Sequence, residues 1–190
     1  MGYDFSVHLI NLYKYYKRKM KNINIIAVFV ILFLAAGIPA AAKNYVVTKD
    51  ASGKQMIIGK LSWKEWQENA GWQNYTPDIY TPDSSIIHKL SNIIHSQNIE
   101  FLLFGGSWCG DSKTEMPKIY YLFNTTGINE ERVKLFGVNR EKFEFSGESI
   151  KYNIKKVPTL IILRNGGEAG RIVEFPQKSW EADILMILQE

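Results

Sequence analysis

Residues 101–124 read FLLFGGSWCGDSKTEMPKIYYLFN, and the other elements of the chain can be placed relative to them. The apolar run Phe101–Phe104 predicts a buried strand. Gly105–Ser107 end that strand, and a helix is expected to begin at Cys109. Its apolar stripe, at spacings of three and four, is Met116, Ile119, Tyr120 and Phe123. The sequence therefore delivers its only cysteine from a strand to the N-terminus of a helix.

That position matters for the chemistry of the thiol. The free backbone N–H groups and the dipole at a helix N-terminus favour the thiolate of Cys109. The carboxylate of Asp111, two residues on, acts in the opposite direction. We therefore expect a moderately activated thiol. Because the chain has one cysteine, an internal disulfide is excluded, and the thiol is either free or bonded to another molecule.

Several motifs together resemble the thioredoxin superfamily. Trp108–Ser112 reads Trp-Cys-Gly-Asp-Ser and is similar to the family's active-site stretch, Trp-Cys-Gly-Pro-Cys. Pro117 stands where thioredoxins carry a helix-kinking proline, and Val157–Leu160 resembles the cis-proline loop, with Asn165-Gly166 following at the family's distance. The resemblance covers roughly residues 84–190 and implies thiol–disulfide exchange through Cys109.

Two positions depart from the family pattern. Ser112 stands where the second, resolving cysteine would be. Its hydroxyl can donate a hydrogen bond to the Cys109 thiolate, but it cannot complete a disulfide. Leu103 stands where the family carries a buried acid that helps to deprotonate the resolving thiol. Both changes favour a monothiol mechanism, in which an outside thiol must resolve the mixed disulfide.

The resemblance also implies a substrate-binding set: Trp108, Gly110, Val157 and Pro158. A cis bond before Pro158 would turn the Val157 backbone outward, so that it could pair with an extended peptide. Trp108 would cover the sulfur. The alternatives are a trans proline that starts a strand, a Trp108 that only packs, and a buried, inert Cys109.

The pattern along the chain predicts an α/β fold. We expect a thioredoxin-like mixed sheet flanked by helices on both faces, with an N-terminal extension made of a β-hairpin and a short helix. Residues 1–42 would be a signal peptide or membrane anchor, 43–83 the extension and 84–190 the thioredoxin-like domain. Expected strands are 44–48, 55–59, 101–104, 133–138, 157–163 and 170–175. Expected helices are 63–69, 84–97, a helix from Cys109, a short one in 147–152 and one capped by Ser179.

The N-terminal segment has the pattern of an export signal. Basic residues in Lys14–Lys21 precede the apolar run Ile25–Ile38, and Pro39–Ala42 offers small residues for cleavage near Ala42. The rival interpretation is an uncleaved membrane tether through residues 23–42, although spanning a membrane takes about 20 apolar residues. In either case we expect the folded part to lie outside the cytoplasmic membrane, in the periplasm or another extracytoplasmic compartment. Translation could begin at Met1 or at Met20.

The charge distribution bears on the partners. The net charge of +4 comes entirely from residues 1–42, where five basic residues face one acid, and the remainder is neutral. We therefore expect no nucleic-acid partner. His88 and His95, seven residues apart, are a poor ligand set, so we expect no metal and no cofactor.

Two functions remain open at this level. The first is an exported protein that performs monothiol exchange with protein clients or small thiols and depends on a separate reducing partner. The second is a non-catalytic thioredoxin-fold module that binds peptides or proteins, with the aromatic segment Trp63–Tyr80 contributing contacts. A cysteine protease is disfavoured, because no histidine is placed by sequence to pair with Cys109. Whether the chain is an enzyme is thus left undecided.

Overall fold

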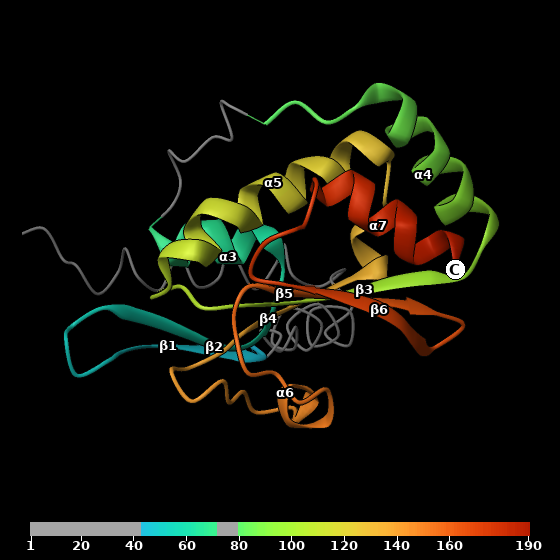
Figure 1. The fold of residues 1–190 in the computed structure, drawn as a ribbon. Coiled ribbons are helices and arrows are strands. Elements are labelled where there is room, and N and C mark those ends of the chain that lie inside the picture. The colour runs from blue at the N-terminus through green and yellow to red at the C-terminus, as the bar shows by residue number, and fades with distance from the viewer. Residues whose placement is uncertain (1–42, 72–79) are drawn as a thin grey trace, which may run out of the picture. The chain divides into compact units, whose positions relative to one another are not determined.

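The computed structural model describes residues 43–71 and 80–190 of the chain. The predicted targeting segment, 1–42, and residues 72–79 of the aromatic loop lie outside the described residues. Residues 43–190 form one compact unit around a six-stranded sheet (Figure 1). The first expected strands and the short helix therefore belong to the same unit as the rest.

The sheet has the strand order β1-β2-β4-β3-β5-β6. Its strands are β1 (Tyr45–Lys49), β2 (Gln55–Leu61), β3 (Ile99–Gly105), β4 (Val133–Gly137), β5 (Thr159–Arg164) and β6 (Gly167–Val173). β3 and β4 run parallel, and the other neighbouring pairs are antiparallel. Asn165 and Gly166, both with positive φ, make the tight turn between β5 and β6. The expected mixed sheet is confirmed.

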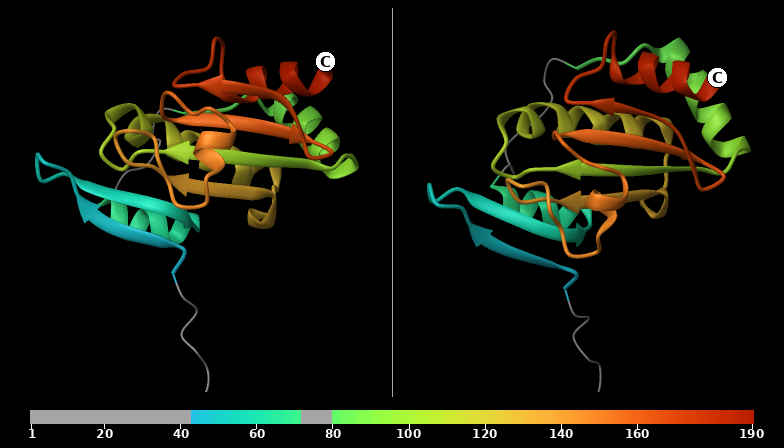
Figure 2. Two further views of the ribbon diagram at one scale, coloured as in Figure 1. Left: turned by 90° about the horizontal axis from the view of Figure 1, so that it is seen from below. Right: turned by 60° about the horizontal axis from the view of Figure 1, so that its bottom comes forward.

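Helices cover the two faces of the sheet unequally. The helical elements are α3 (Trp63–Ala70), α4 (Ser84–Ser96), α5 (Gly110–Thr126), η2 (Glu130–Arg132), α6 (Glu148–Lys151) and α7 (Trp180–Gln189). Figures 1 and 2 show α3, α4, α5 and α7 over one face and the short α6 on the other. The prediction of helices on both faces is confirmed, with the second face covered by a single short helix among the described residues.

The alternation of side chains along β3 supplies two separate cores. Phe101 and Leu103 face α5 and α7 and join the larger cluster, whereas Leu102 and Phe104 point to the opposite face. The second cluster contains Val157 and is contacted at its edge by Trp108 and Cys109. The cysteine thus lies where the second core meets solvent.

The hairpin β1–β2 extends the sheet. Gly59 and Leu61 of β2 pair with Gly137 and Leu135 of β4. A Cβ at Gly137 would lie 2.4 Å from the Ile57 carbonyl oxygen, so the close approach of the two strands requires glycine there. The sequence alone did not decide between an extension and a separate hairpin.

Polar side chains cap the first turns of α4 and α3. The N-cap of α4 is Asp83, whose Oδ1 accepts hydrogen bonds from the N–H groups of Ser85 and Ile86. A carboxylate is a favourable acceptor at a helix N-terminus. Ser62 caps α3. Trp63 and Trp66 of α3 are buried in the core, so these two side chains do not supply the contacts that the binding-module hypothesis expects from Trp63–Tyr80.

Candidate functional site

Cys109 is the N-cap residue of α5 and is half-buried. Its N–H donates to the Gly106 carbonyl, and its Sγ donates a hydrogen bond to the Val157 carbonyl at 3.5 Å. A Cβ added at Gly110, the first residue of α5, would meet no atom within 4 Å. The space beside the thiol is therefore open to a second molecule.

The Val157–Pro158 loop lies next to Cys109, although the two are 48 residues apart in sequence. The Val157–Pro158 peptide bond is cis, and both residues are buried just before β5 begins at Thr159. The Pro158 carbonyl accepts a hydrogen bond from the Glu174 N–H, which ties the loop to the end of β6. This arrangement holds the Val157 carbonyl beside the Cys109 thiol.

Ser112 lies one helical turn after Cys109 and is fully buried. Its hydroxyl oxygen accepts a hydrogen bond from the Gly106 N–H at 3.2 Å. Ser112 thus braces the loop that precedes Cys109. Asp111, in the first turn of α5, is half-buried beside it.

Trp108 is held at both its edge and its face. Its Nε1 donates to the Val138 carbonyl at 2.9 Å, at the end of β4. The Arg140 guanidinium lies 4.8 Å from the ring centroid and the Lys142 ammonium 5.5 Å from it. Two cations over one indole make a favourable cation–π arrangement, which fixes the ring of the residue next to Cys109.

Sequence reasoning missed four residues around this site: Asp50, Ser107, Arg140 and Lys142. Asp50 in the β1–β2 turn accepts hydrogen bonds from Arg140, ninety positions away. The Ser107 hydroxyl donates to the Gln55 carbonyl and accepts from the Ile57 N–H of β2. No motif could have revealed these contacts, since each joins segments that only the sheet brings together.

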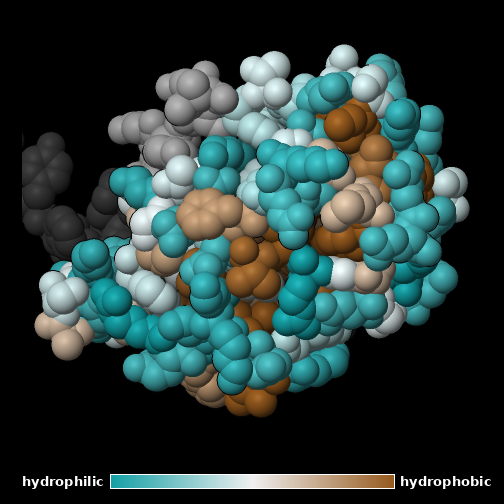
Figure 3. Space-filling view, in the orientation of Figure 1, coloured by the Kyte–Doolittle hydropathy of each residue, from teal (hydrophilic) through white to brown (hydrophobic). Residues whose placement is uncertain are grey.

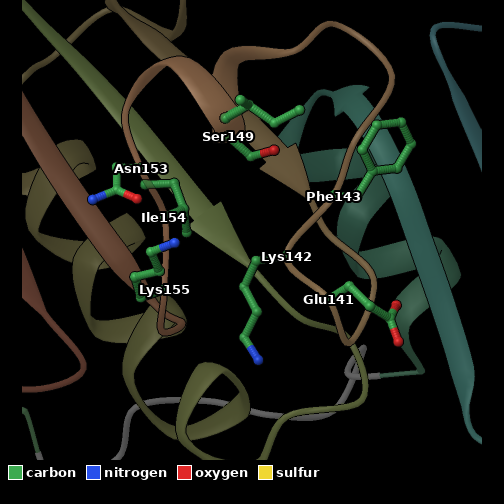
Figure 4. Close-up of a pocket in the computed structure, with 8 residues that line it drawn as sticks. Glu141, Lys142, Phe143, Ser149, Asn153, Ile154 and Lys155 are labelled. Atoms are coloured by element: carbon green, nitrogen blue, oxygen red, sulfur yellow. The ribbon is translucent and has the colours of Figure 1, made fainter.

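A hollow of about 280 Å³ lies in the connection between β4 and β5, which also carries Arg140 (Figure 4). It is lined by Glu141, Lys142, Phe143, Ser149, Ile150, Asn153, Ile154 and Lys155. Ser149 is 2% exposed, and its Oγ has no hydrogen-bond partner among the described residues. Figure 3 shows apolar side chains at the lower edge of the molecule, where α6 of this connection lies.

Residues 43–71 and 80–190 show neither a metal-binding cluster nor a membrane-spanning helix. Within them, no three His, Cys, Asp or Glu side chains gather as a metal site would require. Within the same residues, no helix is long and apolar enough to cross a membrane. His88 and His95 are exposed on α4.

Comparisons with known proteins give partial matches to thioredoxins. No family model matches the chain. It is 31% identical over 70 residues to the thioredoxin of Echinococcus granulosus; the match spans 37% of this chain and 60% of the relative. The chain thus covers less than two thirds of that relative's length.

Solved thioredoxins are also similar. That of Trypanosoma brucei brucei is 26% identical over 54% of this chain and 81% of its own, with a TM-score of 0.32. A mutant thioredoxin from Halobacterium salinarum is 15% identical over 60% of this chain and 92% of its own, with a TM-score of 0.34. The chain is thus similar to thioredoxins in sequence over 70 residues, and it combines this similarity with a mixed sheet and a cysteine at a helix start.

Proposed function

We propose that this protein performs thiol–disulfide exchange with Cys109 as its only nucleophile. One observation carries the proposal: the Cys109 Sγ stands at the start of α5, half-buried, 3.5 Å from the Val157 carbonyl oxygen. A helix N-terminus is a favourable place for a thiolate, and the open space at Gly110 gives a disulfide access to it. The similarity to thioredoxin supports redox chemistry of this class.

The exchange has two steps. The Cys109 thiolate attacks one sulfur of a disulfide in a client or small molecule, and the other sulfur leaves as a thiolate. The product is a mixed disulfide on Cys109. A thiolate from a separate reducing partner then attacks the client sulfur, takes the client into a new disulfide and returns Cys109 as a thiolate. Each step makes one S–S bond and breaks one, so no further oxidant is needed.

The need for an outside thiol follows from Ser112. Its buried hydroxyl occupies the position from which a second thiol would attack the mixed disulfide, and a hydroxyl cannot form an S–S bond. The acid that would serve such a thiol is also replaced, by Leu103, which is buried in the apolar core. Monothiol exchange is therefore the form of the reaction that these side chains support.

The client would lie along the Val157–Pro158 loop. Val157 precedes β5, so its backbone lies outside the strand pairing recorded for the sheet. An extended client segment placed there would bring its disulfide to Cys109 by short strand addition. We place Trp108 and Gly110 beside the same segment.

Export forms part of the proposal. Its support is the order of the basic residues in Lys14–Lys21, the apolar run Ile25–Ile38 and the small residues Pro39–Ala42. The mature or anchored protein would then meet disulfides in an oxidising compartment. Fractionation of cells that express the chain, with intact-mass analysis of its N-terminus, tests both export and cleavage near Ala42.

The exchange is tested on the purified full chain with a disulfide that releases a coloured thiolate. We expect one equivalent of thiolate, one adduct by intact mass, and full release of that adduct by an added small thiol. Cys109→Ser is the matched control and should give neither signal. A wild-type Cys109 that forms no adduct with the native fold intact, and traps no disulfide-bonded client in cell extracts, would refute the proposal.

The hollow in the β4–β5 connection favours a second candidate, a docking module. Its lining combines three apolar side chains, Phe143, Ile150 and Ile154, with charged and polar ones, and the Ser149 hydroxyl has no partner among the described residues. A mixed lining of this kind suits a side chain that has both apolar and polar parts. Cys109→Ala separates the two functions. Unchanged capture of a client by this variant favours docking, and loss of capture favours thiol chemistry.

A further inference from the structure

The turn of the β1–β2 hairpin is tied to the active-site loop through Asp50. One carboxylate oxygen accepts hydrogen bonds from the Ser52 N–H, the Ser52 hydroxyl and the Lys54 N–H. The other accepts from Nε and Nη2 of Arg140. The Asp50 side chain is 5% exposed, so this carboxylate is fully engaged and shielded from water. Its position in turn fixes the direction of the Arg140 guanidinium.

Arg140, held in this direction by Asp50, in turn packs against Trp108. Its guanidinium lies 4.8 Å from the centroid of the indole, whose Nε1 is bonded to the Val138 carbonyl. Lys142 lies over the same ring, and its ammonium donates to the Arg140 carbonyl. The indole is therefore held by a hydrogen bond at its edge and by cations at its face.

A second tie joins the hairpin to the same loop. The Ser107 hydroxyl bonds to the Gln55 carbonyl and to the Ile57 N–H, at 2.8 and 3.0 Å. Gln55 and Ile57 belong to the part of β2 that continues beyond its pairing with β4, which covers Gly59 to Leu61. This end of β2, which pairs with β1 but not with β4, is thus hydrogen-bonded to the residue directly before Trp108.

From these contacts we propose that the hairpin is part of the substrate-binding site: Asp50 orients Arg140, Arg140 clamps Trp108, and the clamped indole favours polypeptide disulfides over small ones. This inference rests on the proposed function. A peptide that docks on Cys109 must lie against the neighbouring indole, and a ring already fixed loses less conformational freedom on binding. A small disulfide needs only the sulfur. Asp50 and Arg140 are positioning residues, since they act through Trp108.

The test compares two probes on the full chain. One is a ten-residue peptide whose single cysteine is linked to 2-nitro-5-thiobenzoate; the other is 4,4′-dithiodipyridine, which is small and neutral. Attack by Cys109 releases a coloured thiolate or thione from each. We expect Asp50→Asn and Arg140→Gln to lower the rate constant with the peptide by about 3- to 10-fold and that with dithiodipyridine by less than about twofold.

Three results mark the clamp itself. The double variant should be no slower than the slower single variant, because both changes break the same link. Arg140→Lys should be intermediate, since it keeps a cation but loses the forked pair of hydrogen bonds. Hydrogen exchange at the Trp108 indole N–H, followed by NMR, should accelerate in Asp50→Asn and Arg140→Gln.

The matched control is Glu168→Gln, which breaks the other Arg–carboxylate pair with two hydrogen bonds, between Arg171 and Glu168 on β6. It should leave both the ratio of the peptide to the dithiodipyridine rate constant and the hydrogen exchange at the Trp108 indole N–H as in wild type. Equal slowing of both probes in folded Arg140→Gln and Arg140→Lys, or unchanged indole exchange, overturns the inference while leaving thiol exchange standing. A wild-type Cys109 inert to both probes instead overturns the proposed function, and this inference with it.

Discussion

The Cys109 thiol donates a hydrogen bond to the Val157 carbonyl oxygen, 3.5 Å away, across a gap of 48 residues in sequence. Cys109 comes from the start of α5 and Val157 from the loop before β5. The two meet because β3 and β5 are neighbours, with Phe104 opposite Thr159. In the proposed function, a client disulfide reacts beside this thiol and this carbonyl.

The first prediction concerns Ser112, one turn after Cys109. Side chains three positions apart on a helix have Cβ atoms about 5–6 Å apart, which a small adjustment of the helix start brings within disulfide reach. We expect Ser112→Cys to form an intramolecular disulfide on oxidation and to turn over with a dithiol reductant alone. Free-thiol titration and intact mass measure the bond.

Thr114→Cys is the control for that variant, since Thr114 is exposed and lies five positions from Cys109. It should keep two titratable thiols under the same oxidation. If Ser112→Cys also keeps two titratable thiols after oxidation, the side chains at positions 109 and 112 are not close enough to form a disulfide.

The second prediction concerns the buried carboxylate of Glu115. It is 5% exposed, accepts a hydrogen bond from the Trp180 indole at 2.9 Å and pairs with Lys118 at 2.7 Å. Glu115→Ala leaves the buried indole N–H without an acceptor, which costs about 1–3 kcal/mol in the free energy of unfolding. Glu115→Gln keeps an acceptor and should cost less.

Urea unfolding measures the difference between the two Glu115 variants. Because the Glu115 side chain joins α5 to α7 and makes no hydrogen bond to the thiol, the rate of Cys109 alkylation should be unchanged in both folded variants. Equal stability of the alanine and glutamine variants would show that the indole bond contributes nothing.

The third prediction concerns acid. The hydrogen bond from the Ser52 hydroxyl, with those from Arg140 and the backbone, holds the pKa of the Asp50 carboxyl well below its usual range. A lowered folded-state pKa means that this contribution to stability is complete above the unfolded value, about 3.9, and is lost as the pH falls toward the folded value. Asp50→Asn should therefore be less stable than wild type at pH 7, and the gap should narrow at pH 2–3.

Unfolding by urea at pH 7, 4 and 2.5 follows that gap. Glu168→Gln is the control variant, whose stability is compared with that of wild type at the same pH values, since Glu168 pairs with Arg171 outside the hairpin. A gap between Asp50→Asn and wild type that stays constant over this range contradicts the assigned role of the carboxylate.

The fourth prediction concerns the join between hairpin and sheet. A Cβ at Gly137 would lie 2.4 Å from the backbone oxygen of Ile57, which no side-chain motion relieves. We expect Gly137→Ala to cost about 2 kcal/mol or more and to weaken amide protection in β2 as well as β4. Gly167→Ala, where the nearest atom is 3.7 Å away, should be nearly neutral.

Thermal unfolding and amide hydrogen exchange check this pair of variants. Loss of protection in β4 alone, with β2 unaffected, would mean that the hairpin does not depend on the contact at Gly137.

The sequence determined the local elements of this fold. Continuous apolar runs marked β3 and β5, because both faces of these strands are buried. Apolar residues with a period of 3.6 marked α5 and α7, because burial of one helix face forces that spacing. Caps and turns are also encoded locally, because Ser62, Ser179 and Asn165-Gly166 act on backbone groups within a few residues of themselves. The position of Cys109 at a helix start needed only the break at Gly105–Ser107.

The tertiary structure alone decided which distant segments meet. Asp50 and Arg140 are ninety residues apart, and nothing in either neighbourhood signals the other. Whether the hairpin extends the sheet depended on the fit of Gly59 and Gly137 across β2 and β4, a matter of backbone approach that periodicity does not encode. The helices, strands, caps and turns follow from the local sequence, because the groups that stabilise them are close in the chain. The surroundings of Trp108 follow from the order of the strands in the sheet, because that order brings distant residues together.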